Sequence, residues 1–169
     1  MRNLKNFMLL LMTISLVTLS GCSSDDNGGS AGKGTITAKI DGTNFTSIDI
    51  ASLASLVAAS NTLTLQGNDA NGNSIIMVIN GYNGTGTYNF DGNSIPLNIA
   101  SYLEIDINNP MNVETWIAPY QSALNGSVTI TQESDDNIQG TFEFTGQNAN
   151  DMSTKAITAG SFSLDKQTF

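Results

Sequence analysis

From Thr35 onward, apolar and polar residues alternate in short runs, which is the pattern of half-buried β-strands. The clearest runs are 35–40, 62–66, 126–132 and 138–145. Turn residues such as Asp41-Gly42 separate them, and no long amphipathic helix interrupts the series. The spacing predicts an all-β domain of about nine or ten strands, either an antiparallel β-sandwich or a flattened β-barrel.

Three stretches refine this picture. Leu53, Leu56 and Val57 have helical spacing for only two turns, so we expect a short helix or an irregular plug over residues 52–59. Residues 75–79 are all apolar, as expected of a central strand covered on both faces. The apolar parity shifts after Ala159, which makes Gly160-Ser161 a candidate β-bulge.

The longest alternation covers residues 95–107 and gives an aliphatic face and a polar face. The aliphatic face consists of Ile95, Leu97, Ile99, Leu103, Ile105 and Ile107. The polar face, which we expect to be exposed, carries Glu104 and Asp106, roughly 7 Å apart along a strand. Such a spacing would suit glycoside hydrolysis, although exposed neighbours are the simpler interpretation. Because the run is longer than most strands, we expect a bend or break at Ala100-Ser101.

The start of the chain has the features of a lipoprotein signal. Arg2 and Lys5 precede an apolar run, residues 7–17, that is too short for the roughly 20 residues a membrane span needs. Leu19-Ser20-Gly21-Cys22 follows and resembles the bacterial lipobox. We therefore predict cleavage before Cys22, the only cysteine, and acylation of its thiol and amine, which together anchor the chain to a membrane.

This signal divides the chain into three segments. We expect a signal peptide over 1–21, a lipidated Cys with a flexible polar tether over 22–34, and an all-β domain over 35–169. The stretch Ser23–Asp26 resembles the acidic tag that exports Bacteroidetes lipoproteins to the outer face of the outer membrane. The predicted location is the outer membrane, with a surface or a periplasmic orientation left open.

Charge and composition exclude several functions. Beyond residue 21 the chain has four lysines, no arginine and 15 acidic residues, hence a side-chain charge of −11. This argues against nucleic-acid binding, which needs a basic surface. The chain has no histidine, and a lipidated Cys22 leaves no free thiol. We predict no catalytic, cofactor-binding or metal-ligating residues.

Aromatic residues gather in the middle third of the chain, among them Tyr102 and Trp116. Aromatic rings on a β surface can stack on sugars, so these two are the candidate ligand-binding residues. The alternative is that they pack at the rim of the core.

Four segments carry a family resemblance: Ala38–Phe45, Gly126–Thr131, Ile138–Thr145 and Ile157–Phe162. They resemble a family of small Bacteroidetes lipoproteins of uncharacterised function, over most of the mature chain. The chain has Phe45 where that family often has Trp, and Ala159 where it often has Asn. The resemblance implies a single all-β domain on a lipid anchor and adds no chemistry.

These observations predict a lipid-anchored protein of the cell envelope that acts as a non-enzymatic binding or interaction module. Its partner would be a glycan or another protein. The alternatives are a carboxylate-dependent hydrolase and a structural accessory subunit of an outer-membrane complex.

Overall fold

The computed structural model describes residues 31–106 and 108–169. The predicted signal peptide, Cys22, the tether up to residue 30, and Ile107 lie outside the described residues. The described residues contain these strands: β1 (Thr35–Ile40), β2 (Thr43–Thr46), β3 (Ser52–Val57), β4 (Thr62–Asn68), β5 (Ser74–Asn80), β6 (Gly86–Asp91), β7 (Ile99–Ile105), β8 (Val113–Ala118), β9 (Leu124–Glu133), β10 (Asn137–Gln147) and β11 (Thr154–Thr168). Single 3-10 turns, Asp49–Ala51 and Ala58–Ser60, flank β3. The all-β prediction is confirmed, with eleven strands in these residues. None of their helices is long and apolar enough to span a membrane.

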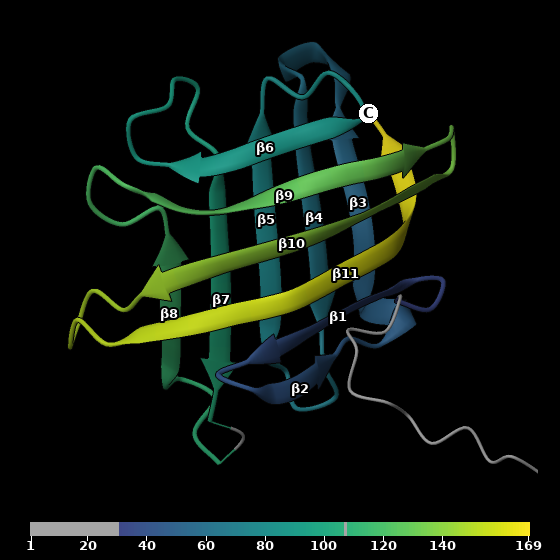
Figure 1. Cartoon of the computed structure of the whole chain (residues 1–169). Helices are drawn as coiled ribbons and strands as arrows, with labels where there is room; N and C mark the ends of the chain where they lie inside the picture. The colour runs from purple at the N-terminus through teal and green to yellow at the C-terminus, as the bar shows by residue number, and fades with distance from the viewer. Residues whose placement is uncertain (1–30, 107) are drawn as a thin grey trace, which may run out of the picture.

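The strands form two layers that pack face to face (Figure 1). The front layer has the order β2-β1-β11-β10-β9-β6, and the back layer has the order β3-β4-β5-β7-β8. Strands of one layer run across those of the other, as in orthogonal sheet packing. Hydrogen bonds join the layers at both ends of the back layer, because β11 pairs with β3 and β10 pairs with β8. The result is a flattened barrel.

Strand β11 belongs to both layers. Over most of its length it lies antiparallel between β1 and β10, and its last residues pair in parallel with β3. The register with both antiparallel neighbours shifts around Ala159, whose φ of 49° is left-handed. The predicted β-bulge is therefore present, one residue earlier than the sequence suggested. Such a bulge bends and twists a strand locally. The change of layer comes further along β11, between Asp165, which still pairs with β10, and Lys166, which pairs with β3.

The expected helix or plug over residues 52–59 is wrong. Residues Ser52–Val57 form β3, and only a single 3-10 turn follows, at Ala58–Ser60. Strand β3 pairs along its whole length with β4, and its second half also pairs with the end of β11. Hydrogen bonds from both sides therefore outweigh a helical spacing that lasted only two turns.

The expected orientation of the residue 95–107 run is also wrong. Strand β7 begins at Ile99, with no bend at Ala100-Ser101, and buries Ala100 and Tyr102 instead of the aliphatic residues. The register explains this, because Tyr102 lies directly opposite Ile75 of β5 and Trp116 of β8. Directly paired residues point to the same side of a sheet, and both partners are core residues.

In the front layer, β10 buries the face that carries its phenylalanines. Phe142 and Phe144 are buried and stack on each other, and Phe142 also contacts Phe162 of β11. Two glycines make room for these rings. A Cβ on Gly140 would lie 2.6 Å from the Phe162 ring, and one on Gly160 would lie 2.7 Å from the Phe142 ring. Close aromatic packing between β10 and β11 therefore requires glycine at both positions.

The inward and outward faces of β10 can be separated by neighbouring substitutions. We expect Phe142→Ala to reduce the free energy of unfolding by about 3–5 kcal/mol, because it leaves a cavity among aromatic rings. Thr141→Ala, at the adjacent exposed position, should change it by less than about 1 kcal/mol. Chemical denaturation of both variants measures the difference, and equal costs would contradict the assigned faces.

Candidate functional site

One corner of the barrel holds a cluster of aromatic and charged side chains. Lys155 of β11 forms an ion pair with Glu104 of β7, and the Tyr102 hydroxyl donates to Glu104 Oε1 at 3.1 Å. The Lys155 ammonium also lies 4.2 Å from the centroid of the Trp116 ring, within the range of cation–π attraction. Burial raises the pKa of the Tyr102 hydroxyl well above its usual range, and the Glu104 carboxylate raises it further. Tyr102 therefore remains a protonated donor.

The structure brings the two candidate ligand-binding aromatics together in this corner. Tyr102 and Trp116 are only 4% and 6% exposed, and their ring centroids are 6.0 Å apart. The Trp116 Nε1–H donates to Ser153 Oγ at 3.1 Å. Each ring lies against the other and under Lys155, so a sugar that stacks on either must first displace this lysine.

The two carboxylates considered for hydrolysis do not face a common space. Glu104 points into the corner, where Lys155 and Tyr102 contact it. Asp106 lies beyond the end of β7, and its carboxylate accepts the backbone N–H of Asn108 at 2.9 Å. The carboxylate directly across from Glu104 is that of Glu114 on β8, not that of Asp106. The Glu114 carboxylate accepts a hydrogen bond from the Asn148 side chain. Structural hydrogen bonds therefore engage all three carboxylates.

A second corner repeats the same chemistry where β11 meets β3. Lys166, directly opposite Ala54 of β3, binds Glu133 Oε1 at 2.8 Å, and the Tyr82 hydroxyl donates to Glu133 Oε2 at 2.8 Å. Burial of the Glu133 carboxyl disfavours its charged form. The hydrogen bonds from Lys166 and Tyr82 outweigh this effect, so the pKa of Glu133 lies below its usual range. Both corners thus combine a β11 lysine with a glutamate and a tyrosine.

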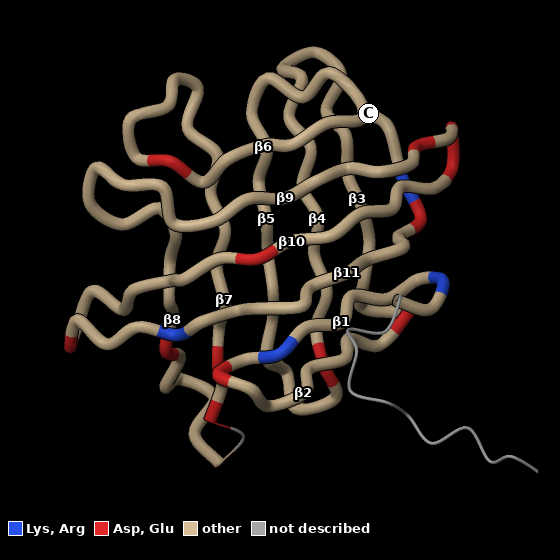
Figure 2. The backbone as a smooth tube through the Cα atoms, in the orientation of Figure 1, with Lys and Arg blue, Asp and Glu red and all other residues tan. Residues whose placement is uncertain are grey.

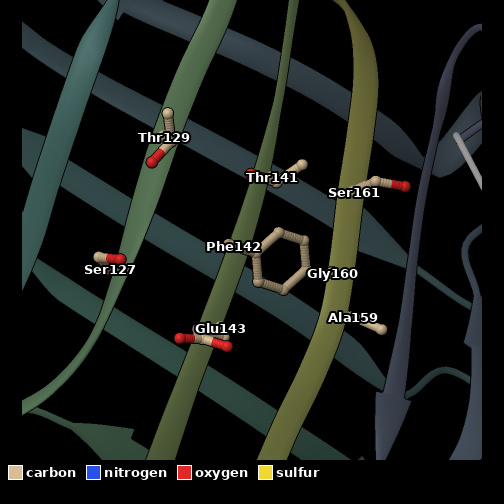
Figure 3. A pocket seen from close by; sticks show the side chains of 8 residues that line it. All are labelled: Ser127, Thr129, Thr141, Phe142, Glu143, Ala159, Gly160 and Ser161. Carbon is tan, nitrogen blue, oxygen red and sulfur yellow. The ribbon is translucent and has the colours of Figure 1, made fainter. Parts of the chain in front are cut away.

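The outer face of the front layer carries a row of hydroxyl groups. In register across the strands are Thr87, Thr129, Thr141, Ser161, Thr37 and Thr46. A shallow hollow of ≈ 370 Å³ lies over β9, β10 and β11 in the middle of this row. Figure 3 shows Ser127, Thr129 and Glu143 around it, with the Phe142 ring beside Gly160. The hollow offers hydroxyls and one exposed carboxylate to a ligand.

The outer face of the back layer has the opposite character. The outward residues of its strands include large aliphatic side chains on four of the five strands: Leu53, Val57, Ile76, Val78, Ile99, Leu103, Ile105, Val113 and Ile117. We call these nine residues the apolar face. The positions between them are Ser55, Thr62, Thr64, Gln66, Ser101 and Thr115, and none is charged. Figure 2 likewise shows the middle of β4 and β5 free of charged residues.

Residues 75–79 contribute to this face from the centre of the layer. Strand β5 lies between β4 and β7, as a central strand should, and buries Ile75, Met77 and Ile79. Its other side, with Ile76 and Val78, is only half-buried. No element of the described chain forms a layer over that side (Figure 1). The expectation that the strand over residues 75–79 is covered on both faces is therefore wrong.

A family model described as Domain of unknown function (DUF6252) matches residues 32–164. The chain belongs to the DUF6252 family. The match begins just before β1 and ends within β11, so it covers both layers of the barrel. No curated protein and no solved structure matches the chain.

Sequence reasoning missed the two lysines that organise the corners. Lys155 is 51 positions from Glu104, and Lys166 is 33 positions from Glu133. Each lysine is far from its glutamate in the sequence, so spacing along the chain carries no signal for either pair. The only available indication was the scarcity of lysine, since just four follow residue 21.

The Glu133 corner should make stability depend on pH. Because the folded state lowers the pKa of Glu133, its contribution is complete above the unfolded value of about 4.3 and is lost as pH falls through the lower folded value. We expect Glu133→Gln to cost about 2–3 kcal/mol at pH 7. The cost should shrink as pH falls below about 4.3, because the unfolded wild-type chain then takes up a proton that the folded carboxylate does not.

Denaturant unfolding between pH 3 and pH 7 measures this difference. Glu143→Gln, which changes an exposed carboxylate on the outer face, is the matched control and should cost little at any pH. A cost for Glu133→Gln that stays constant over the whole range would show that the charge of Glu133 is not what stabilises this corner.

Proposed function

We propose that this protein is a lipid-anchored, non-enzymatic interaction module of the cell envelope, related to the Bacteroidetes lipoproteins that its sequence resembles. The anchor is supported by the basic and apolar leader and by the Leu19–Cys22 box. Two or three acyl chains on Cys22 would hold the chain on a membrane where a single chain would not. The predicted location is the outer membrane.

The apolar face is the observation that carries the interaction role. Antiparallel sheets that face water usually have polar residues on the exposed side. Contiguous apolar patches on soluble domains mark interaction sites more often than scattered apolar residues do. Here nine large aliphatic side chains share one outer face without a charged neighbour among the positions between them. A partner that covers this face would remove them from water.

The anchor approaches the domain from the opposite layer. The Ala31 backbone N–H donates to Ser161 Oγ at 2.9 Å, and the Gly34 N–H donates to the Ser163 carbonyl at 2.7 Å. Both acceptors belong to β11 in the front layer. Ala31 is nine positions after Cys22, a reach of at most about 30 Å. This attachment supports a domain whose front layer lies toward the bilayer and whose apolar face is available to a partner.

The alternatives differ in their support. A structural accessory subunit is also consistent with the apolar face, since such a subunit needs a docking surface. Glycan binding through Tyr102 and Trp116 stays a prediction that requires Lys155 to move away from the rings. For a hydrolase, Glu104 would first have to be released from Lys155 and Tyr102.

The anchor can be tested with Cys22→Ser in the full chain. We expect the variant to leave the membrane fraction and to lose acyl mass, because the serine hydroxyl does not replace the acylated thiol. Ser23→Ala, beside the modified residue, is the control and should remain in the membrane fraction. Fractionation with intact-mass spectrometry measures both properties. A Cys22→Ser chain that stays in the membrane fraction, together with an unacylated wild type, would contradict the proposal.

A further inference from the structure

The apolar face is continuous across the strands of the back layer. Val78 of β5 lies directly opposite Ile99 of β7, and Ile105 of β7 lies opposite Val113 of β8. Ser101 lies between them, opposite Ile76 on one side and Ile117 on the other. These pairs place aliphatic side chains next to one another across three strands and join them into one surface.

Charge is excluded from this face although the chain is strongly acidic. The carboxylates of β7 and β8, Glu104 and Glu114, both point inward to the Lys155 corner. Two copies of a chain whose residues beyond 21 carry a side-chain charge of −11 repel each other through most pairs of surfaces. Contact between two uncharged faces keeps the acidic groups of both copies away from the interface.

We infer that the apolar face is a self-association surface, on which a second copy of this chain packs face to face about a two-fold axis. In such a dimer the same patch serves both subunits, which requires it to be compatible with itself. An uncharged face of aliphatic, hydroxyl and amide side chains meets this requirement. Two sheets packed in this way would lie about 10 Å apart.

The size of the face sets the strength of the dimer. Five strands about 4.8 Å apart, each with about seven residues at 3.3 Å, cover roughly 550 Å² per copy. The total of roughly 1,100 Å² is close to the lower limit for a specific interface, so the dimer is weak and concentration-dependent. Confinement of the copies to one membrane raises their effective concentration. This last step, unlike the dimer itself, rests on the proposed anchor.

The bilayer is the other occupant to consider, and the point of attachment disfavours it. The described chain begins at Ala31, whose backbone N–H donates to Ser161 of β11 in the front layer. To place the apolar face on the membrane, the nine residues after Cys22 would have to reach from the front layer past the back layer. A flexible chain of that length has a root-mean-square span of only about 17 Å.

Sedimentation velocity over a wide range of concentrations tests the inference, using the full chain with Cys22→Ser so that no acyl chain contributes. We expect the average mass to rise from that of a monomer toward twice that value. Val78→Lys should keep the chain monomeric at every concentration, because it places a charge in the centre of the face. Thr141→Lys, an equivalent central position on the front layer, should associate like its parent.

Ser101→Lys provides a second variant in case Val78→Lys lowers stability. Ser101 is on the same face but contributes no aliphatic packing, so its replacement should also abolish the dimer while the melting temperature stays close to that of the parent. Circular dichroism and thermal melting confirm that each variant is folded.

Three results would overturn the inference. The first is a parent chain that stays monomeric at all concentrations. The second is a Ser101→Lys variant that associates as well as the parent chain does. The third is binding of the parent chain to neutral phosphatidylcholine vesicles that is lost in Val78→Lys. The anchor proposal fails by a different result, a wild-type chain without acyl mass. That result would not change the sedimentation that we expect. A monomer in solution with acylated Cys22 would leave the anchored module in place and remove only self-association.

Discussion

The fold depends on a single strand that is shared by both layers. Strand β11 must pair with β1 and β10 in the front layer and then reach β3 in the back layer. The strand contains a bulge at the left-handed Ala159, and a lysine near each of its ends binds a glutamate where the layers meet. Hydrogen bonding around the barrel and closure of its two corners therefore both depend on β11. Two of the four lysines beyond residue 21 lie in these corners.

The sequence predicted the strands whose apolar residues face the core and misplaced those whose apolar residues do not. Alternation correctly located β1, β4 and β10, because their inward positions are apolar and their outward positions are polar. It failed for β7, where aliphatic residues point outward and Tyr102 points inward. Period-2 spacing separates two faces but does not say which of them is buried. That choice depends on the residues directly opposite, and those come from other parts of the chain.

The same limit applies to the candidate site. Composition drew attention to Tyr102 and Trp116, and the structure does bring them together. Their covering group, Lys155, lies on a strand near the end of the chain, so no local pattern connects it with the rings. Three residues of the apolar face, Ile99, Leu103 and Ile105, stood out in the sequence as part of the aliphatic half of the residue 95–107 run. We expected those aliphatic residues to be buried in the core, so the sequence did not predict the exposed surface on which the proposed interaction rests.

The orientation of β7 is the claim on which the apolar face depends, and thiol labelling tests it directly. In a Cys22→Ser background the chain has no other cysteine, so Ile99→Cys and Ala100→Cys each introduce a unique thiol on opposite faces of β7. At a concentration low enough to keep the chain monomeric, we expect the thiol at position 99 to react with a maleimide almost as fast as in the unfolded chain. The thiol at position 100 should react only when the protein opens. Rapid labelling at position 100 with protection at position 99 would contradict the account.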